Sequence, residues 1–160
     1  MAKKTGITTA ELMLTIAIGS ILITLASINL FGSKARTSLR TTVDTLMADF
    51  NHQQLKAMVG DSTLSLRPQS YGIRFNQNNY VLFRDINYSP TDNRNFTVSL
   101  GDNILFNQIT LPDNQLVFAT LSGAILNFDP AANSIGLIDQ VTGKQQTIML
   151  NRFGVISGVN

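Results

Sequence analysis

A long apolar run that contains a single carboxylate constrains this chain more than any other feature. The run extends from Ile7 to Phe31, and Glu11 is the only charged side chain between Lys4 and Lys34. A charge placed near the centre of a bilayer costs at least about 2.5–3.5 kcal/mol. Glu11 is therefore a candidate functional residue.

The same run predicts a helix of membrane length. As a helix, Leu12–Phe31 would be about 30 Å long, which matches the hydrocarbon core of a bilayer. Its polar residues are small, and the hydroxyls of Thr15, Ser20 and Thr24 can bond back to the helix backbone. Small residues four positions apart also allow helices to approach closely.

Beyond the apolar run, the pattern predicts an amphipathic half-helix. Ser33–Val59 contains no proline and no glycine, and Gly60 then provides a stop signal. Apolar residues recur at spacings of three and four, which marks one face for burial. These residues are Leu39, Val43, Leu46, Phe50, Ala57 and Met58. We predict one helix from about Thr8 to Val59.

After Gly60 the hydrophobic period changes to two, which predicts short strands separated by turn residues. The predicted strands are Thr63–Arg67, Tyr71–Asn76, Tyr80–Arg84, Phe96–Leu100, Ile104–Ile109, Leu116–Ala119, Ala124–Phe128, Ser134–Ile138, Gln145–Leu150 and Val155–Gly158. They predict an antiparallel sheet or two small sheets that cover the apolar stripe of the helix. The expected fold class is α+β, with a long N-terminal helix packed on a small antiparallel β-sheet body. Asn87–Asn95 is expected to be an exposed loop.

Composition argues against several classes of function. The chain has no cysteine and one histidine, His52, so we predict no metal site and no cofactor. No nucleophile-elbow motif accompanies His52, and we predict that the protein is not an enzyme. Lysine and arginine total 12 against 10 acidic residues, and without Lys3 and Lys4 the two counts are equal. The overall charge therefore makes no case for nucleic-acid binding.

Three features coincide in the first third of the chain: a six-residue basic leader that ends at Gly6, a glutamate at the fifth position after it, and an apolar half-helix that continues into an amphipathic one. With the β-rich body, they resemble the type IV pilin and pseudopilin family. The specific motif lies between Lys3 and Leu14. The body resembles minor pseudopilins of the GspH/FimT type, in Tyr71–Phe75, Tyr80–Phe83 and Ile148–Ile156.

The resemblance implies a pilin-like fold in four parts. These are a class III leader peptide at 1–6, a transmembrane and filament-core half-helix at 7–31, an amphipathic half-helix at 32–59 and a β-rich globular body at 60–160. It also implies that a prepilin peptidase cuts between Gly6 and Ile7 and methylates the new amine of Ile7. Glu11 would pair with that amine, its own or a neighbour's, because an unpaired buried charge costs several kcal/mol.

The mature start would be Ile7-Thr8-Thr9-Ala10-Glu11, whereas the family usually has Phe-Thr-Leu-Ile before the glutamate. The implied function is a structural subunit, a minor pilin, of a type IV pilus or related filament. The implied partners are other pilin or pseudopilin subunits, the prepilin peptidase, the inner-membrane assembly platform and, before assembly, membrane lipid. The implied location is a single pass of the inner membrane with the N-terminus in the cytoplasm, as Lys3 and Lys4 suggest, followed by an extracellular or periplasmic filament.

Alternatives remain open at this point. The nearest is a minor pseudopilin of a type II secretion system. Others are a secreted protein with a signal peptide cut after Ala26, and a single-pass adhesin or sensor. The last is a DNA-binding competence pilin, which would need basic residues clustered in space, such as Arg67, Arg74, Arg84 and Arg94.

Overall fold

The computed structural model describes residues 8–60, 69–126 and 128–159, and along its helix it describes the side chains of 8–24 and 39–59. The helix α1 (Thr9–Val59) lies against a body of strands. Within the described residues the strands are β1 (Tyr71–Phe75), β2 (Asn79–Arg84), β3 (Phe96–Ser99), β4 (Ile104–Ile109), β5 (Gln115–Phe118), β6 (Ser134–Asp139), β7 (Gln145–Leu150) and β8 (Ile156–Val159), with a short 3-10 helix η1 (Pro112–Asn114) before β5.

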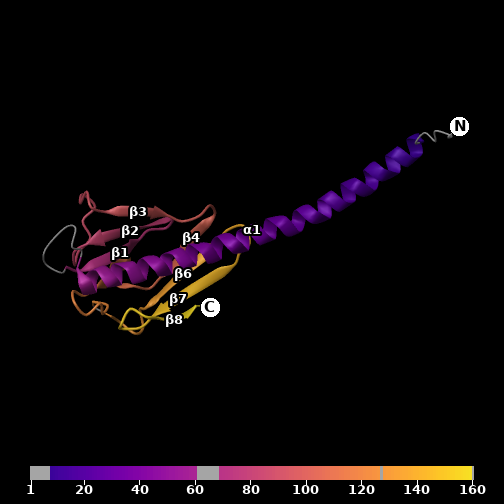
Figure 1. Cartoon of the computed structure of the whole chain (residues 1–160). Coiled ribbons are helices and arrows are strands. Elements are labelled where there is room, and N and C mark those ends of the chain that lie inside the picture. Colours follow the sequence, from indigo (N-terminus) through magenta and orange to yellow (C-terminus); the bar gives the residue numbers. More distant parts are fainter. Residues whose placement is uncertain (1–7, 61–68, 127, 160) are drawn as a thin grey trace.

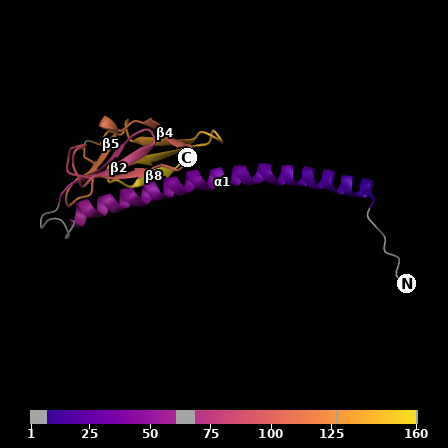
Figure 2. The same cartoon turned by 90° about the horizontal axis from the view of Figure 1, so that it is seen from above.

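The strands form two four-stranded sheets, with the orders β3-β2-β1-β5 and β4-β6-β7-β8. All neighbouring strands are antiparallel. Figure 1 shows α1 crossing both sheets, and Figure 2 shows it along one face of the body. The N-terminal part of α1 extends well beyond the strands in both views (Figures 1 and 2).

One stripe of α1 packs on the body. Its residues are at most 4% exposed: Leu39, Val43, Leu46, Phe50, Gln53 and Ala57. Their alternating spacing of four and three keeps them on one side of the helix. Met58, which we predicted in this stripe, is 44% exposed. It follows Ala57 by one residue and is therefore turned by about 100° around the helix axis.

Three aromatic rings connect the helix to both sheets. The ring of Phe50 on α1 meets Phe75 on β1 edge to face at 6.1 Å, and Phe75 meets Phe106 on β4 in the same manner at 5.3 Å. Edge-to-face pairs of this kind contribute about 0.5–1.5 kcal/mol beyond their burial. The core is therefore continuous from α1 through the first sheet into the second.

Most predicted strands are confirmed. β4 and β7 have the predicted bounds, and β1, β2, β3, β5, β6 and β8 differ by one residue at one or both ends. The strand predicted at Thr63–Arg67 lies outside the described residues. The strand predicted at Ala124–Phe128 is wrong, because its described residues form only an isolated bridge from Ile125 to Phe118. There, the amide of Ile125 donates to Arg152 and that of Leu126 donates to Val117, so no continuous ladder forms.

The predicted fold class needs correction. We predicted a long helix, with an apolar half of membrane length, on a small antiparallel sheet in a pilin-like arrangement. The body contains two four-stranded sheets. No helix among the described residues is both long enough and apolar enough to cross a bilayer. The described residues form a mixed α+β fold.

Candidate assembly site at the start of helix α1

A capping box formed by Thr8 and Glu11 begins helix α1. Thr8 is the N-cap, with an extended backbone. The backbone N–H of Glu11 donates to the Thr8 hydroxyl oxygen at 3.3 Å, and the backbone N–H of Thr8 donates to the Glu11 carboxylate at 3.4 Å. This reciprocal pair satisfies two backbone donors that the helix itself leaves free. The positive end of the helix dipole also favours a carboxylate at this position.

The structure places one of the three predicted site residues. Glu11 is exposed in the first turn of α1, whereas Gly6 and Ile7 lie outside the described residues. The carboxylate contacts the backbone nitrogen of Thr8, the residue that follows Ile7 in the chain. Its pairing with an amine on Ile7 stays a prediction. Sequence reasoning missed the cap, although Thr8-Thr9-Ala10-Glu11 has the spacing of a capping box.

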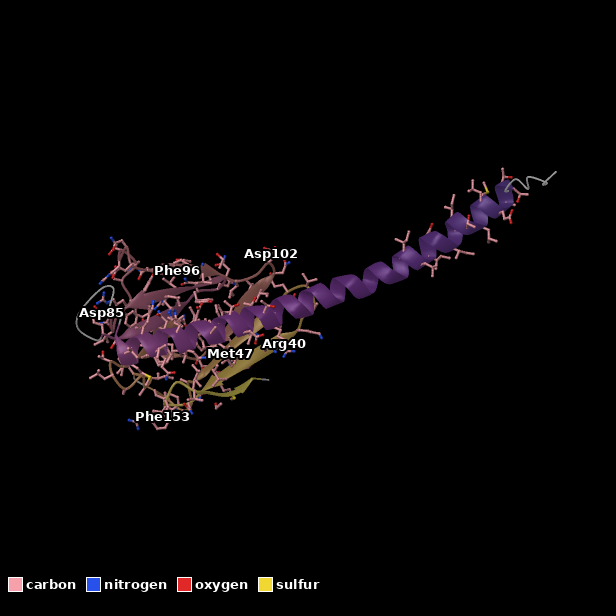
Figure 3. The ribbon with its side chains drawn as sticks, in the orientation of Figure 1. Arg40, Met47, Asp85, Phe96, Asp102 and Phe153 are labelled. Atoms are coloured by element: carbon pink, nitrogen blue, oxygen red, sulfur yellow. The ribbon has the colours of Figure 1, made fainter. Side chains whose placement is uncertain are left out.

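Beyond the cap lies the apolar arm, which we define as residues Leu12–Ile23 of α1. Its large apolar side chains are 50–74% exposed: Leu12, Met13, Leu14, Ile16, Ile18, Ile21, Leu22 and Ile23. Figure 3 shows side chains projecting to several sides of this segment, away from the body. A surface with so many exposed apolar side chains commonly marks a site of interaction with another protein or with a membrane.

Polar groups on and next to the arm are directed into the helix backbone, as predicted. The hydroxyl of Thr15 donates to the carbonyl of Leu12 at 2.8 Å, and that of Ser20 donates to Ile16 at 2.6 Å. The hydroxyl of Thr24 donates to Ser20 at 2.8 Å. These internal bonds lower the cost of placing the hydroxyls in apolar surroundings.

The four arginines considered for a nucleic-acid patch do not all meet. Arg84 and Arg94 line one groove beside α1. Arg74 instead donates to the carbonyl of Asp113 at 2.5 Å, and its guanidinium lies 5.8 Å from the ring centre of Tyr88. Tyr71 on β1 lines the same groove as Arg84. Arg74 lies three residues further along β1, so its side chain projects from the other face of the strand. Arg67 lies outside the described residues.

His52 is exposed on α1 and lines the same groove as Arg84. Among the described residues, no three histidine, aspartate or glutamate side chains lie close enough together to hold a metal ion.

Comparison of the chain with protein-family models, with curated proteins and with solved structures finds no match.

Proposed function

We propose that this protein is a structural subunit, a minor pilin, of a type IV pilus or related filament, and that it assembles through its N-terminal helix. The apolar arm is the observation that carries this proposal. Its large side chains are at least half exposed, whereas the stripe of α1 from Leu39 to Ala57 is buried against the body. One helix thus has a half already packed within its own subunit and a half that needs other partners.

Helices of other subunits would supply those partners. A helix that is apolar on all sides is stable when other apolar groups surround it. Burial of such surface contributes roughly 25 cal/mol per Å². Small residues four apart, Thr15 with Gly19 and Ser20 with Thr24, allow neighbouring helices to approach closely. A Cβ atom built on Gly19 would meet nothing within 4 Å, so this side of the helix is open to a neighbour.

Glu11 would give the assembly its register. A carboxylate inside a bundle of apolar helices costs several kcal/mol unless a positive charge pairs with it. In the proposal, a prepilin peptidase cuts between Gly6 and Ile7 and methylates the new amine, and that amine pairs with Glu11. The subunit would wait in the inner membrane until an assembly platform adds it to the filament with its body outward.

Two substitutions separate this role from helix capping. Glu11→Gln keeps a side chain that can serve in a capping box but removes the negative charge. Thr8→Ala removes the N-cap hydroxyl but keeps the carboxylate. We expect Glu11→Gln to lower the amount of subunit in sheared filaments by about tenfold or more, because about 1.4 kcal/mol already corresponds to tenfold. Thr8→Ala should retain most incorporation. Immunoblotting of sheared filaments from the native host measures both.

Equal losses for the two variants would assign Glu11 to helix capping and contradict its assembly role. The mass of the N-terminal peptide tests processing independently. We expect a chain that begins at methylated Ile7. A chain that begins at Ser27 would instead identify a secreted protein and would contradict the filament proposal.

A further inference from the structure

A groove of about 440 Å³ lies between the packed half of α1 and the first sheet. We call it the α1–β2 groove. Its polar lining includes His52 and Lys56 from α1, Arg84 from β2 and Arg94 from the loop before β3. Its apolar lining includes Leu82 and Phe96. Figure 3 labels Phe96 beside α1, and Phe96 is largely exposed.

Arg84 is the unusual member of this groove. The residue is only 8% exposed, and its Nε atom is buried without a hydrogen-bond partner. Within the described residues, the one ion pair joins Arg94 to Asp92. Besides the hydrogen bonds from Arg94, the charge of Arg84 also contributes to the lowered pKa of Asp92, but no described carboxylate lies within ion-pair distance of Arg84. A buried N–H donor without a hydrogen-bond partner costs about 1–3 kcal/mol. Its place in the lining of an open groove indicates that its partner is a group from another molecule.

The neighbouring charges limit how negative that partner can be. Arg94 is bound to Asp92 at 2.5 Å. Asp49, also in the lining, adds a negative charge and accepts a hydrogen bond from Tyr80. The ammonium of Lys56 lies 5.9 Å from the ring centre of Tyr71. Lys56 and Arg84 are thus the cations with no carboxylate contact in the described part of the groove. A partner with one negative charge matches this balance better than a polyanion, which needs a longer run of cations.

We propose that the α1–β2 groove binds a carboxylate carried beside an aromatic or aliphatic group, as at the C-terminus of a peptide partner. The guanidinium of Arg84 binds the carboxylate through charge-assisted hydrogen bonds. Leu82 and Phe96 contact the apolar group. This binding site goes beyond the filament role and does not depend on it, because no residue of the apolar arm contributes to the groove.

The simplest probe of this chemistry is N-acetyl-phenylalanine, which has one carboxylate and one aromatic ring. The full chain in neutral detergent micelles is titrated while backbone amide shifts are followed by NMR. We expect saturable shifts at residues 79–84 and 52–56, with a Kd on the order of 1 mM, as suits so small a ligand. N-acetyl-phenylalaninamide, which lacks the charge, should give no saturable shifts.

Two groove variants and a matched control complete the test. Arg84→Met should weaken binding by about tenfold or more and raise Tm by a few degrees, because it removes a buried N–H donor that has no hydrogen-bond partner. Lys56→Gln should weaken binding by about threefold and leave Tm nearly unchanged, since Lys56 is partly exposed. Arg152→Met, on an exposed turn outside the groove, should change neither quantity.

Several outcomes would overturn the proposal. One is the absence of saturable shifts, and another is equal binding of the amide. Unchanged binding by Arg84→Met and Lys56→Gln would also overturn it. If inorganic phosphate or a thymidine oligonucleotide saturates the same amides more tightly than N-acetyl-phenylalanine does, the groove is a phosphate site and the carboxylate assignment is wrong.

Discussion

The hydroxyl of Tyr80 donates a hydrogen bond of 2.6 Å to the carboxylate of Asp49, and this bond joins strand β2 to helix α1. Tyr80 is buried in the core. Burial raises the pKa of its hydroxyl well above the usual value of 10, and the hydrogen bond to Asp49 and the charge of Asp49 act in the same direction. The contact therefore favours the protonated phenol and fixes how the first sheet sits against the helix.

Tyr80→Phe should lower the free energy of unfolding. Hydrogen bonds to charged groups contribute about 1.5–3 kcal/mol, so we expect a loss in that range at neutral pH. Urea denaturation of the full chain in detergent measures it. Tyr88→Phe is the control, because Tyr88 contacts the ring of Phe83 and has no hydrogen bond to α1 among the residues that the structure describes. Equal effects of the two substitutions would contradict the role of the Tyr80–Asp49 bond.

The same bond predicts a loss of stability at high pH. Because the pKa of Tyr80 is raised in the folded state, its contribution is complete below the unfolded value of 10. Above pH 10 the unfolded chain releases this proton first, so stability falls as pH rises. The difference in unfolding free energy between the wild type and Tyr80→Phe should therefore shrink between about pH 9 and about pH 11. A difference that stays constant across this range would contradict the prediction.

Gln53→Leu should destabilise the protein although it places an apolar residue in an apolar stripe. The buried side-chain amide of Gln53 donates to the carbonyl of Gly72 at 2.9 Å. Leucine would leave that carbonyl without this donor, at a cost of about 1–3 kcal/mol. Asn51→Leu, on the exposed side of the same turn, should have a much smaller effect. Thermal unfolding of the two variants measures the difference, and a higher Tm for Gln53→Leu would contradict the expectation.

Gly72→Ala should be destabilising because strand β1 leaves no room for a methyl group there. A Cβ atom at Gly72 would clash with the ring of Phe83 and lie 2.9 Å from the backbone oxygen of Leu116. Overpacking of this kind costs about 1–3 kcal/mol. Gly158→Ala is the matched control, since a Cβ atom on Gly158 would meet nothing within 4 Å. We expect Tm to fall for Gly72→Ala alone. Similar Tm values for the two variants would contradict this expectation and would show that the backbone of β1 shifts to accommodate the methyl group.

Arg94→Gln should change the titration of Asp92. Hydrogen bonds from Arg94 lower the pKa of Asp92 from 3.8 to about 2. In the variant, the pKa should return toward 3.8, which carboxyl NMR shifts can follow. The stability that this pair adds is present above the unfolded pKa and is lost as pH falls toward 2, but it is small because both groups are close to solvent. An unchanged pKa for Asp92 would contradict the assignment.

Local patterning predicted much of the fold. The turn residues that precede β4 and β7, Gly101-Asp102 and Thr142-Gly143-Lys144, helped to predict the bounds of these strands. The spacing of four and three from Leu39 to Phe50 identified the buried stripe. Gln53 was missed because a polar residue carries no burial signal, although it lies three residues after Phe50 on the same side of the helix. The segment at Ala124–Phe128 has strand-like composition, and only its tertiary hydrogen bonds show that it is not a strand.

The candidate sites were less predictable. Glu11 stands out in the sequence because it is a charge in an apolar run, and its capping partner Thr8 can be read from spacing alone. The burial of Arg84 has no comparable signal. An arginine at the end of a strand is usually exposed, whereas this one is buried in a groove that residues of α1, β2 and β3 line together.

The chain of rings from Phe50 through Phe75 to Phe106 has a mechanical consequence. Because the packed half of α1 contacts strands of both sheets, and the rings also join the two sheets, tension applied to the arm is shared by both. A load on one sheet alone would tend to peel it from the other. With the load shared between the sheets in this way, we expect the body to resist pulling as a single unit.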